Sequence, residues 1–372
     1  MPFDISQFQP RAWEVMARSV ESDRVAGTYL LCGPDGCGRW GLAVSFAALL
    51  NCEARTRTAG GALRPCGGCR NCRLIFALNF EGLAVAAPLP PHKGEDEAVE
   101  LTNEVIDLKR REPFAVLSAT ANLTIPIDTA RRIKRTMATK PPPGVYRTII
   151  FYQMERMRPE AADALLKMIE EPPSQAVILL IAEKAERLLP TIQSRSRKVT
   201  LRSSPPEVVA EYLRAQYGLA EARAELAART AEGIAGRAVQ AAESGDDEAS
   251  GRVTAFQLFR SLFEDSGPET VARLTAALGE RDRGEAEYLL HLWQSLARDC
   301  MQLAVAGAGG AVVNTDFRAE LERLAEHFAD PATAVRLAEE IKIALAHFRL
   351  NVHIHGALAA LALRTKAAAS RH

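Results

Sequence analysis

The chain has 372 residues, which is enough for two or three domains. Its 46 lysines and arginines equal its 46 aspartates and glutamates, so it lacks the overall basic field that drives non-specific binding to nucleic acids. The first residues are polar, and no apolar run reaches the roughly 20 residues that span a bilayer. The composition therefore predicts a cytoplasmic protein with no membrane partner.

A glycine-rich segment follows the first predicted strand. Gly33–Trp40 reads GPDGCGRW and has the length and glycines of the phosphate-binding loop G-x-x-x-x-G-K-[ST]. In such a loop the lysine reaches the phosphates and the hydroxyl holds Mg²⁺. Arg39 replaces the lysine and Trp40 replaces the hydroxyl residue, and an indole cannot ligate a cation. The segment predicts a degenerate nucleotide site that is not expected to bind ATP, although a phosphate held by Arg39 stays open. Its residues are Gly33, Gly36, Gly38 and Arg39.

Four of the seven cysteines lie close together in the sequence: Cys52, Cys66, Cys69 and Cys72. Disulfide frameworks belong to small secreted chains, so this cluster favours a metal site. The spacing C-x2-C-x2-C lets thiolates turn onto one ion, and Gly67 and Gly68 permit the tight backbone. We expect a closed, structural Zn²⁺ site with Cys52 as the fourth ligand. Reduced cysteines without a ligand and an iron–sulfur cluster stay open as alternatives, but the Cys-Pro that completes the cluster motif is missing.

Five short apolar or β-branched runs predict strands, and helical patterns separate them. Two runs, Thr148–Tyr152 and Ala176–Ile181, are almost continuously apolar, as in a parallel sheet covered on both faces. The other predicted strands are Thr28–Cys32, Leu83–Ala87 and Lys198–Leu201. The predicted helices are Trp40–Leu50, Thr129–Ala138 and Pro159–Glu171. This alternation predicts an α/β domain built on a parallel sheet.

Shifts in composition suggest where the chain changes character. Pro88–Glu100 is polar and proline-rich and predicts an exposed loop, whereas Ser203–Pro206 ends the strand–helix alternation. Ser244–Gly251 reads SGDDEASG and predicts a linker between helical regions. We therefore expect three domains: an α/β domain over residues 1–202 with a zinc module at 52–72, a small helical domain over 203–247, and a larger helical domain over 248–372.

Two further segments carry specific motifs. Asp163–Pro173 reads DALLKMIEEPP, and Leu188–Ser196 reads LLPTIQSRS. Together with the glycine loop and the cysteines after it, they resemble the delta-prime branch of the clamp-loader AAA+ family of bacterial DNA polymerase III, whose motifs are N-A-L-L-K-x-L-E-E-P-P and L-L-x-T-I-x-S-R-C. The resemblance covers roughly Thr28–Leu201 and continues weakly through the helical remainder. Residues 73–147 match poorly, and 88–124 looks like an insertion.

The resemblance implies an AAA+-like domain, a helical lid and a C-terminal helical collar. It also implies positions at which active members carry catalytic groups. Tyr152 and Gln153 stand where active members have the acidic pair for Mg²⁺ and water, and Ala182 and Gly236 align with two sensor positions. All these groups are missing together, so we expect no intrinsic ATPase activity.

One catalytic group of the family remains. Arg195 occupies the arginine-finger position, and an arginine supplied in trans stabilises charge on a transferring phosphoryl group. Ser196 stands where the family has a cysteine. The resemblance implies that Arg195 reaches ATP held by a neighbouring subunit. The open alternative is a surface arginine beside the basic residues Arg197 and Lys198.

The resemblance implies a non-hydrolysing clamp-loader subunit that supports loading of the sliding clamp in DNA replication. Its implied partners are tau/gamma-like ATPase and delta-like subunits, with the sliding clamp and primed DNA reached through the complex. Two alternatives stay open. The first is a tau/gamma-like subunit that hydrolyses ATP with Arg39 as its lysine. The second is a zinc-containing module that binds nucleic acid, which the neutral net charge disfavours.

Overall fold

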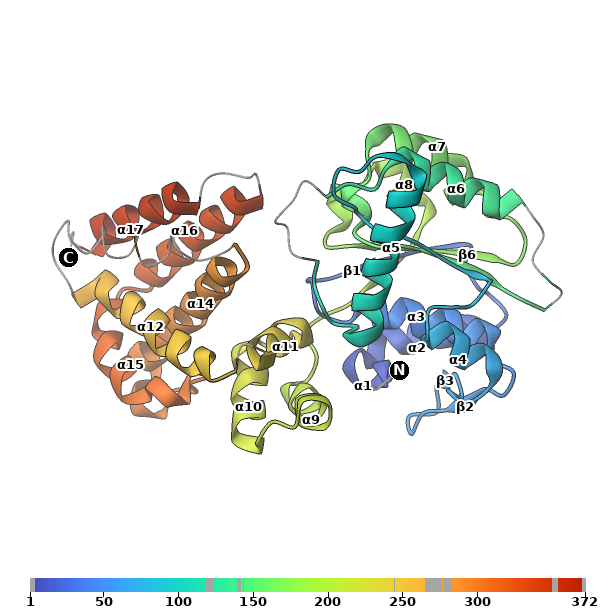
Figure 1. Cartoon of the computed structure of the whole chain (residues 1–372). Helices are drawn as coiled ribbons and strands as arrows, with labels where there is room; N and C mark the ends of the chain where they lie inside the picture. Colours follow the sequence, from blue (N-terminus) through green and yellow to red (C-terminus); the bar gives the residue numbers. More distant parts are fainter. Residues whose placement is uncertain are drawn as a thin grey trace. The chain divides into compact units, whose positions relative to one another are not determined.

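Figure 1 shows the computed structural model of the chain, which describes residues 4–117, 123–138, 142, 144–243, 245–264, 276, 283–349 and 354–369. The chain divides into two units. The first comprises residues 1–117 and 121–240, and the second comprises residues 118–120 and 241–372.

A five-stranded parallel sheet forms the centre of the first unit (Figure 1), with strand order β4-β5-β6-β1-β7. Every residue of the middle strand is buried, as the apolar run predicts. The strands are β1 (Thr28–Cys32), β4 (Leu83–Ala86), β5 (Arg147–Phe151), β6 (Ala176–Ala182) and β7 (Arg197–Thr200). The five predicted strands and the parallel α/β sheet are thereby confirmed.

Helices cover both faces of this sheet (Figure 1). The helices α1 (Ile5–Phe8), α2 (Pro10–Glu21), α3 (Arg39–Asn51) and α4 (Arg70–Phe76) lie on one side, and α6 (Ile127–Ala138), α7 (Pro159–Glu170) and α8 (Pro190–Arg195) lie on the other. Every residue of α3 is buried. A two-stranded ribbon, β2 (Thr56–Arg57) with β3 (Leu63–Arg64), lies between α3 and α4 in the sequence. The three predicted helices are confirmed within one or two residues at their ends.

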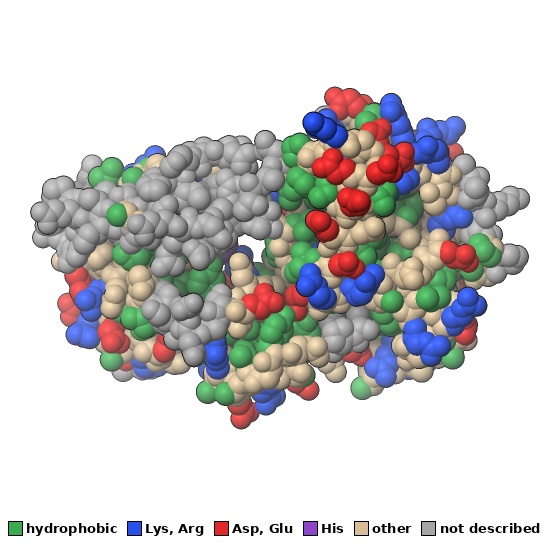
Figure 2. Space-filling model, in the orientation of Figure 1, with side chains coloured by type: hydrophobic (Ala, Val, Ile, Leu, Met, Phe, Trp, Pro, Cys, Tyr) green, Lys and Arg blue, Asp and Glu red, His purple; other side chains and the backbone are tan. Residues whose placement is uncertain are grey.

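The predicted loop at Pro88–Glu100 is partly wrong, because helix α5 (Gly94–Arg111) begins within it. The first turn of α5 carries three acidic residues and its last turn carries three basic residues, so both ends complement the helix dipole. Figure 2 shows acidic side chains along the exposed face of α5. At the base of this insertion the backbones of Leu89 and Thr124 exchange two hydrogen bonds, of 2.9 and 3.0 Å.

Three helices complete the first unit after the sheet: α9 (Pro206–Tyr217), α10 (Glu221–Thr230) and the start of α11 (Ala235–Glu243). Two short 3-10 turns, Met154–Arg156 and Ala185–Arg187, follow β5 and β6. The turn before α11 contacts the segment that leaves the sheet. The Ser204 N–H donates to the Gly233 carbonyl at 2.9 Å, and Gly233 has a φ of +73°.

The second unit is helical in its described residues. Its elements are α12 (Gly245–Glu264), α14 (Arg283–Ala306), η3 (Gly307–Gly309), η4 (Thr315–Phe317), α15 (Arg318–Leu324), η5 (Ala325–Phe328), α16 (Pro331–Arg349) and α17 (Ile354–Ala369). The predicted linker at Ser244–Gly251 is wrong for Gly245–Gly251, which belong to α12, whereas Ser244 lies outside the described residues. Small and acidic residues suit the start of a long helix as well as a linker. The later turns of α12 bury Phe256, Phe259 and Leu262.

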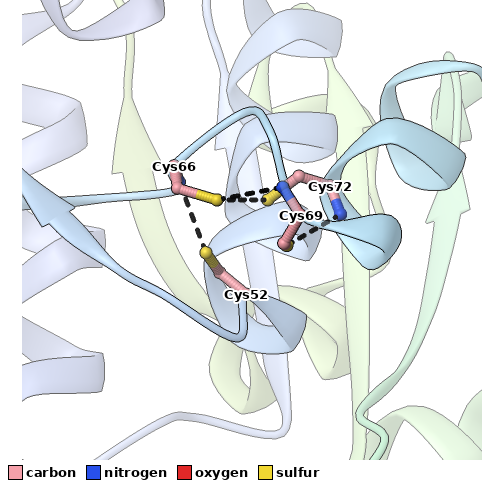
Figure 3. Close-up of side chains that lie close together, drawn as sticks. All are labelled: Cys52, Cys66, Cys69 and Cys72. Atoms are coloured by element: carbon pink, nitrogen blue, oxygen red, sulfur yellow. Dashed lines mark hydrogen bonds between the residues drawn. The ribbon is translucent and has the colours of Figure 1, made fainter.

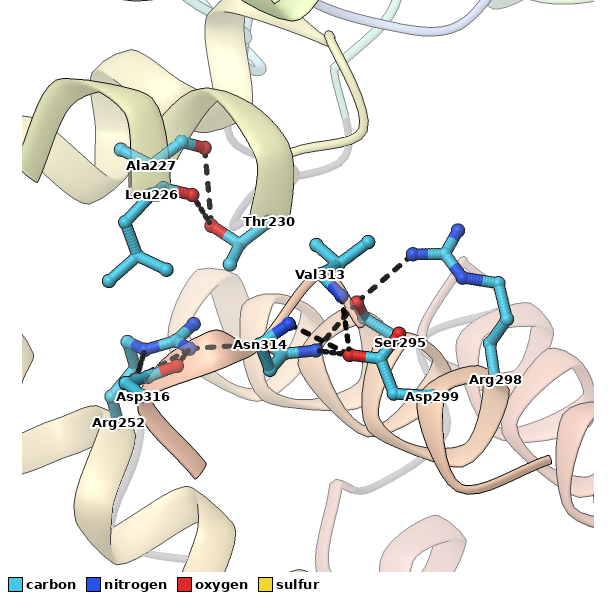
Figure 4. Close-up of polar contacts among 10 residues, drawn as sticks. All are labelled: Leu226, Ala227, Thr230, Arg252, Ser295, Arg298, Asp299, Val313, Asn314 and Asp316. Carbon is cyan, nitrogen blue, oxygen red and sulfur yellow. Dashed lines mark hydrogen bonds and ion pairs between the residues drawn. The ribbon is translucent and has the colours of Figure 1, made fainter. Parts of the chain in front are cut away.

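A buried polar network holds the segment between α14 and α15 (Figure 4). The Arg252 guanidinium pairs with the Asp316 carboxylate at 2.8 Å and donates to the Asn314 amide oxygen at 3.1 Å. The Asp299 carboxylate accepts from the Asn314 backbone and side chain at 2.8 and 2.7 Å. Such networks hold irregular backbone in place because each buried polar group that loses its partner is costly. Figure 4 also shows a separate contact within α10, where the Thr230 hydroxyl donates to the Leu226 carbonyl at 2.9 Å.

None of the described helices is long and apolar enough to cross a bilayer.

The contact at Gly233 gives a stability test. A Cβ at this position would lie 2.0 Å from the Ser204 carbonyl oxygen, whereas a Cβ at Gly218, which also has positive φ, would meet no heavy atom within 4 Å. Gly218→Ala should therefore cost only the left-handed backbone penalty, about 1 kcal/mol, whereas Gly233→Ala should cost about 3 kcal/mol or more. Urea unfolding of the two variants measures both. Equal losses of unfolding free energy would show that the backbone can relax at Gly233.

Candidate functional site

The four predicted zinc ligands come from two helix ends and the chain between them (Figure 3). Cys52 caps the C-terminus of α3, Cys69 caps the N-terminus of α4, and Cys72 lies in the first turn of α4. The fourth, Cys66, follows β3. All four sulfur atoms lie within 4.8 Å of one another, and those of Cys66 and Cys72 are 4.0 Å apart. The fold thus brings the predicted ligand set together.

Backbone N–H groups point at the sulfurs. Cys66 donates to the Cys52 sulfur at 3.3 Å, and Cys69 donates to the Cys66 sulfur at 3.3 Å. Such bonds favour thiolates, and the N–H groups of Cys69 and Gly68 lower the pKa of Cys66 to about 6. Burial instead raises the pKa values of Cys52 and Cys72. A shared cation would offset that cost because it stabilises every thiolate at once. The cluster could therefore hold a metal ion such as zinc, in a four-sulfur donor set.

The degenerate glycine loop lies between β1 and α3, as the motif predicts. Gly36 and Gly38 have φ angles of +80° and +102°, and α3 begins at Arg39. The Arg39 side chain is only 3% exposed and forms an ion pair with Asp35 inside the loop. One of its terminal nitrogens, Nη1, has no partner among the described residues. Burial lowers the pKa of Arg39. The guanidinium is therefore committed to the interior of the protein.

Two aromatic rings and a lysine form a cluster near Arg39. The Trp40 and Tyr152 rings meet edge to face at 5.7 Å, and both residues are almost fully buried. The Lys109 ammonium lies 4.3 Å from the centre of the Tyr152 ring and 5.8 Å from that of Trp40. It also donates to the Ala115 carbonyl. The residues that replace the Mg²⁺ ligand and one member of the acidic pair thus form a packed cluster.

The other degenerate positions also contact this region. Gln153 follows Tyr152 with a φ of +52° and is 2% exposed. The Gly236 N–H donates to the Gly36 carbonyl at 3.0 Å, and a Cβ on Gly236 would lie 2.7 Å from the Gly36 Cα. No larger residue fits at position 236 without moving the loop. Ala182 is the last residue of β6 and is fully buried.

Motif reasoning did not identify several charged residues of this region. Lys109 and Glu112 come from the insertion, for which no motif exists, and their partners are distant in sequence. Glu155 lies in the turn after β5, and its carboxylate accepts from the Glu183 N–H at 3.0 Å. The carboxylates of Glu155 and Glu183 both favour the charged form of Arg39. The region therefore holds acidic groups, but not at the aligned positions. The sequence could have indicated Glu155 only through its place, as a polar residue shortly after the end of a buried strand.

Arg195 lies apart from this cluster in the fold. It is the last residue of α8, directly before β7, and its side chain is 42% exposed. The guanidinium pairs with Glu170 at 3.0 Å and donates to the Thr191 carbonyl at 3.3 Å. Glu170 belongs to the DALLKMIEEPP motif, so the fold joins the two motifs. The exposed guanidinium can exchange these partners for another anion.

The charge of Lys109 gives a pH test. Burial, and then the charge of Arg39, lower its pKa to about 7, below the value of about 10.4 for an exposed lysine. Between these values the unfolded chain binds a proton that the folded chain releases, so this group's contribution to stability rises with pH. The slope is at most about 1.4 kcal/mol per pH unit.

We expect the unfolding free energy of the native protein, minus that of Lys109→Met, to rise between about pH 7 and about pH 9. Methionine keeps much of the side-chain volume and removes the titrating group. Urea unfolding at several pH values measures the difference. A difference that falls or stays flat over this range would contradict the lowered pKa.

Comparisons with known proteins find similarity to subunits of DNA polymerase III. A family model described as DNA polymerase III, delta subunit, matches residues 8–205, more than half of the chain. DNA polymerase III subunit delta' of Bacillus subtilis is 25% identical over 266 residues, covering 71% of this chain and 68% of that protein. The Pseudomonas aeruginosa subunit delta' is 32% identical over 192 residues, covering 52% of this chain and 47% of that protein.

Other similar proteins carry gamma or tau names. DNA polymerase III subunit tau of Escherichia coli is 27% identical over 282 residues, covering 73% of this chain and 38% of that protein. The crystal structure of a DNA polymerase III gamma subunit-related protein from Thermotoga maritima aligns with a TM-score of 0.41 and 16% identity, covering 96% of this chain and 99% of that one.

Proposed function

Because the chain belongs to the family described as DNA polymerase III, delta subunit, we propose that it is a delta-prime-like clamp-loader subunit that does not hydrolyse ATP itself. In this proposal it acts in DNA replication, in a complex with tau/gamma-like and delta-like subunits. It reaches the sliding clamp and primed DNA through that complex.

One observation supports the non-hydrolysing part of the proposal, namely that the Trp40 and Tyr152 rings and the Lys109 side chain pack together. In this proposal they fill the place where a working site needs a hydroxyl, an acid and a metal ion. The two basic groups, Arg39 and Lys109, lie close enough for the charge of the first to lower the pKa of the second. In this proposal a Mg²⁺ beside them would meet repulsion from positive charge.

The main alternative is a tau/gamma-like ATPase, and the similarity to the E. coli tau subunit supports it. Glu155 also favours it, since one of its carboxylate oxygens is buried and has no partner among the described residues. The other oxygen of Glu155 argues against this alternative, because it already accepts a hydrogen bond from the Glu183 N–H. Turnover of MgATP by the purified chain, lost on Arg39→Ala, is the result that would favour this alternative.

We assign Arg195 as an arginine finger for a neighbouring subunit's ATP. The exposed position at the end of α8 and the exchangeable pair with Glu170 support this role. An exposed ion pair contributes at most about 1 kcal/mol, so a phosphate group can displace it at small cost. The planar guanidinium can also donate two parallel hydrogen bonds to two oxygens of a phosphate group.

We propose that Cys52, Cys66, Cys69 and Cys72 hold one structural Zn²⁺. The set provides four sulfur ligands and no open position, as in closed zinc sites. The ion would tie the end of α3 to the start of α4. In the same proposal residues 1–202 form the AAA+-like domain, 203–247 the lid and 248–372 the collar that holds neighbouring subunits.

Arg195→Ala tests the finger. In a loader reconstituted with tau/gamma-like and delta-like subunits, clamp and primed DNA, the ATP site completed by Arg195 should lose about 10³-fold in turnover. The total rate should fall to what the other sites sustain, while the complex still elutes intact from a sizing column. Arg195→Lys should behave similarly because it keeps the charge but loses the planar fork.

The matched control is Arg18→Ala, which removes another exposed, ion-paired arginine from the first unit. It should leave turnover unchanged. If Arg195→Ala also leaves the turnover of the assembled loader unchanged, Arg195 is not the finger.

Cys69→Ser tests the zinc site. The variant should lose the one bound zinc per chain that metal analysis should find in the native protein, and its thermal unfolding temperature should fall because metal binding contributes to folding. Cys300→Ala, which removes a buried cysteine of the second unit, should keep the zinc. Native protein without stoichiometric zinc would refute the assignment.

A further inference from the structure

An isolated antiparallel bridge between Leu89 and Thr124 lies at the base of the insertion, and the last turn of its helix α5 lies near Arg39 of the glycine loop. Lys109, in the last turn of α5, points inward and is 3% exposed, whereas its neighbour Arg110 is exposed. Its ammonium lies over Tyr152 and donates to the Ala115 carbonyl. The end of α5 is therefore anchored beside Arg39 by a buried cation.

Three residues later, Glu112 reaches helix α9. It is 7% exposed, and one of its oxygens accepts from the Tyr212 hydroxyl at 3.0 Å and from the Tyr217 hydroxyl at 2.5 Å. The other oxygen accepts from the Phe114 N–H at 2.7 Å. Hydrogen bonds to a carboxylate are about twice as strong as neutral ones. The Glu112 side chain thus joins the insertion to α9, whose Tyr212 lies 100 residues later in the chain.

Phe114 fills the space between these two parts. Its ring lies 4.8 Å from that of Phe8 and 5.2 Å from that of Tyr212. An added Cβ on Gly38 would lie 3.2 Å from the Phe114 ring, and one on Gly236 would lie 2.5 Å from the Phe114 carbonyl oxygen. The same residue therefore contacts the glycine loop and both helical segments that face it, α9 and the start of α11.

We propose that Lys109, Glu112 and Phe114 form an internal latch that packs against the glycine loop and ties α9 to it in the free protein. In a working P-loop protein, the lysine at the motif position that Arg39 holds here contacts a phosphate group of the nucleotide. In this chain the protein's own side chains occupy the neighbourhood of Arg39. The helices after the sheet are therefore held in place without a nucleotide.

The latch deepens the proposed non-hydrolysing role, because it explains how the glycine loop stays packed. The two share Lys109, but the latch also needs Glu112 and Phe114, on which the proposed function does not depend. The proposed function depends on the positions of Trp40, Tyr152 and Gln153. The latch depends on Glu112 and on the tyrosines of α9. An experiment on Glu112 can thus fail without touching the proposed function.

Hydrogen–deuterium exchange of the full-length chain tests the latch. In Glu112→Ala, amide exchange should speed up by about tenfold or more in both the glycine loop, residues 33–40, and α9, residues 206–217, because three bonds to a buried carboxylate are lost, two from α9 and one from Phe114. Peptides over residues 66–76 at the cysteine cluster should keep their native rates. Glu104→Ala, an exposed change on the same helix, should match the native protein throughout.

Tyr217→Phe is the second variant, in case Glu112→Ala unfolds the first unit. It keeps the ring and removes one hydroxyl, so exchange should rise in the same two segments by a smaller factor. Faster exchange in α9 alone, or no change beyond that of Glu104→Ala, would overturn the latch and leave the proposed function standing. ATP turnover by the unmodified chain alone would instead refute the proposed function.

Discussion

The burial of two basic side chains, Arg39 and Lys109, beside the glycine loop is the constraint on which the first unit depends. A buried charge is costly unless other groups satisfy it. Arg39 meets Asp35, and Lys109 meets the Ala115 carbonyl and the face of Tyr152. Since Lys109 lies in the last turn of α5, this end of the helix packs near the glycine loop. The C-terminal end of α5 therefore contributes to the interior of the first unit.

Helix α3 connects the two sites of the first unit. Its N-terminus follows the glycine loop at Gly38, and its C-terminus is capped by Cys52. Near that end, the Asn51 side chain exchanges hydrogen bonds of 3.0 and 2.8 Å with the backbone of Tyr146, just before β5. All residues of α3 are buried, so the helix is closely packed along its whole length. A displacement of the backbone at either end would therefore strain the packing of the whole helix. The cysteine cluster thus sits on the same support as the degenerate loop.

The pair of Arg195 and Glu170 is a different kind of interaction. Both side chains are more than a third exposed, so water screens their attraction and little free energy holds them together. This weakness suits a proposed finger that must leave its resting partner when a neighbouring subunit presents ATP. The buried Lys109 and Glu112 have no comparable freedom.

The sequence alone determined the local features. Apolar runs placed the five strands, because a strand buried on both faces has few other compositions. The cysteine spacing identified a ligand set that the fold gathers within 4.8 Å, because ligands a few residues apart meet through local turns. The replacement of the loop motif's hydroxyl residue by Trp40 was likewise visible at a single position.

Only the tertiary structure decided what fills the degenerate site. Pro88–Glu100 read as a loop because its prolines and charges dominate the composition, and Lys109 carried no motif. The partners of Glu112, Tyr212 and Tyr217, lie about 100 residues away, and no local pattern specifies a contact over that separation. Side chains from distant segments come into contact only when the whole domain folds. Patterns of neighbouring residues therefore do not predict which of them will pack together.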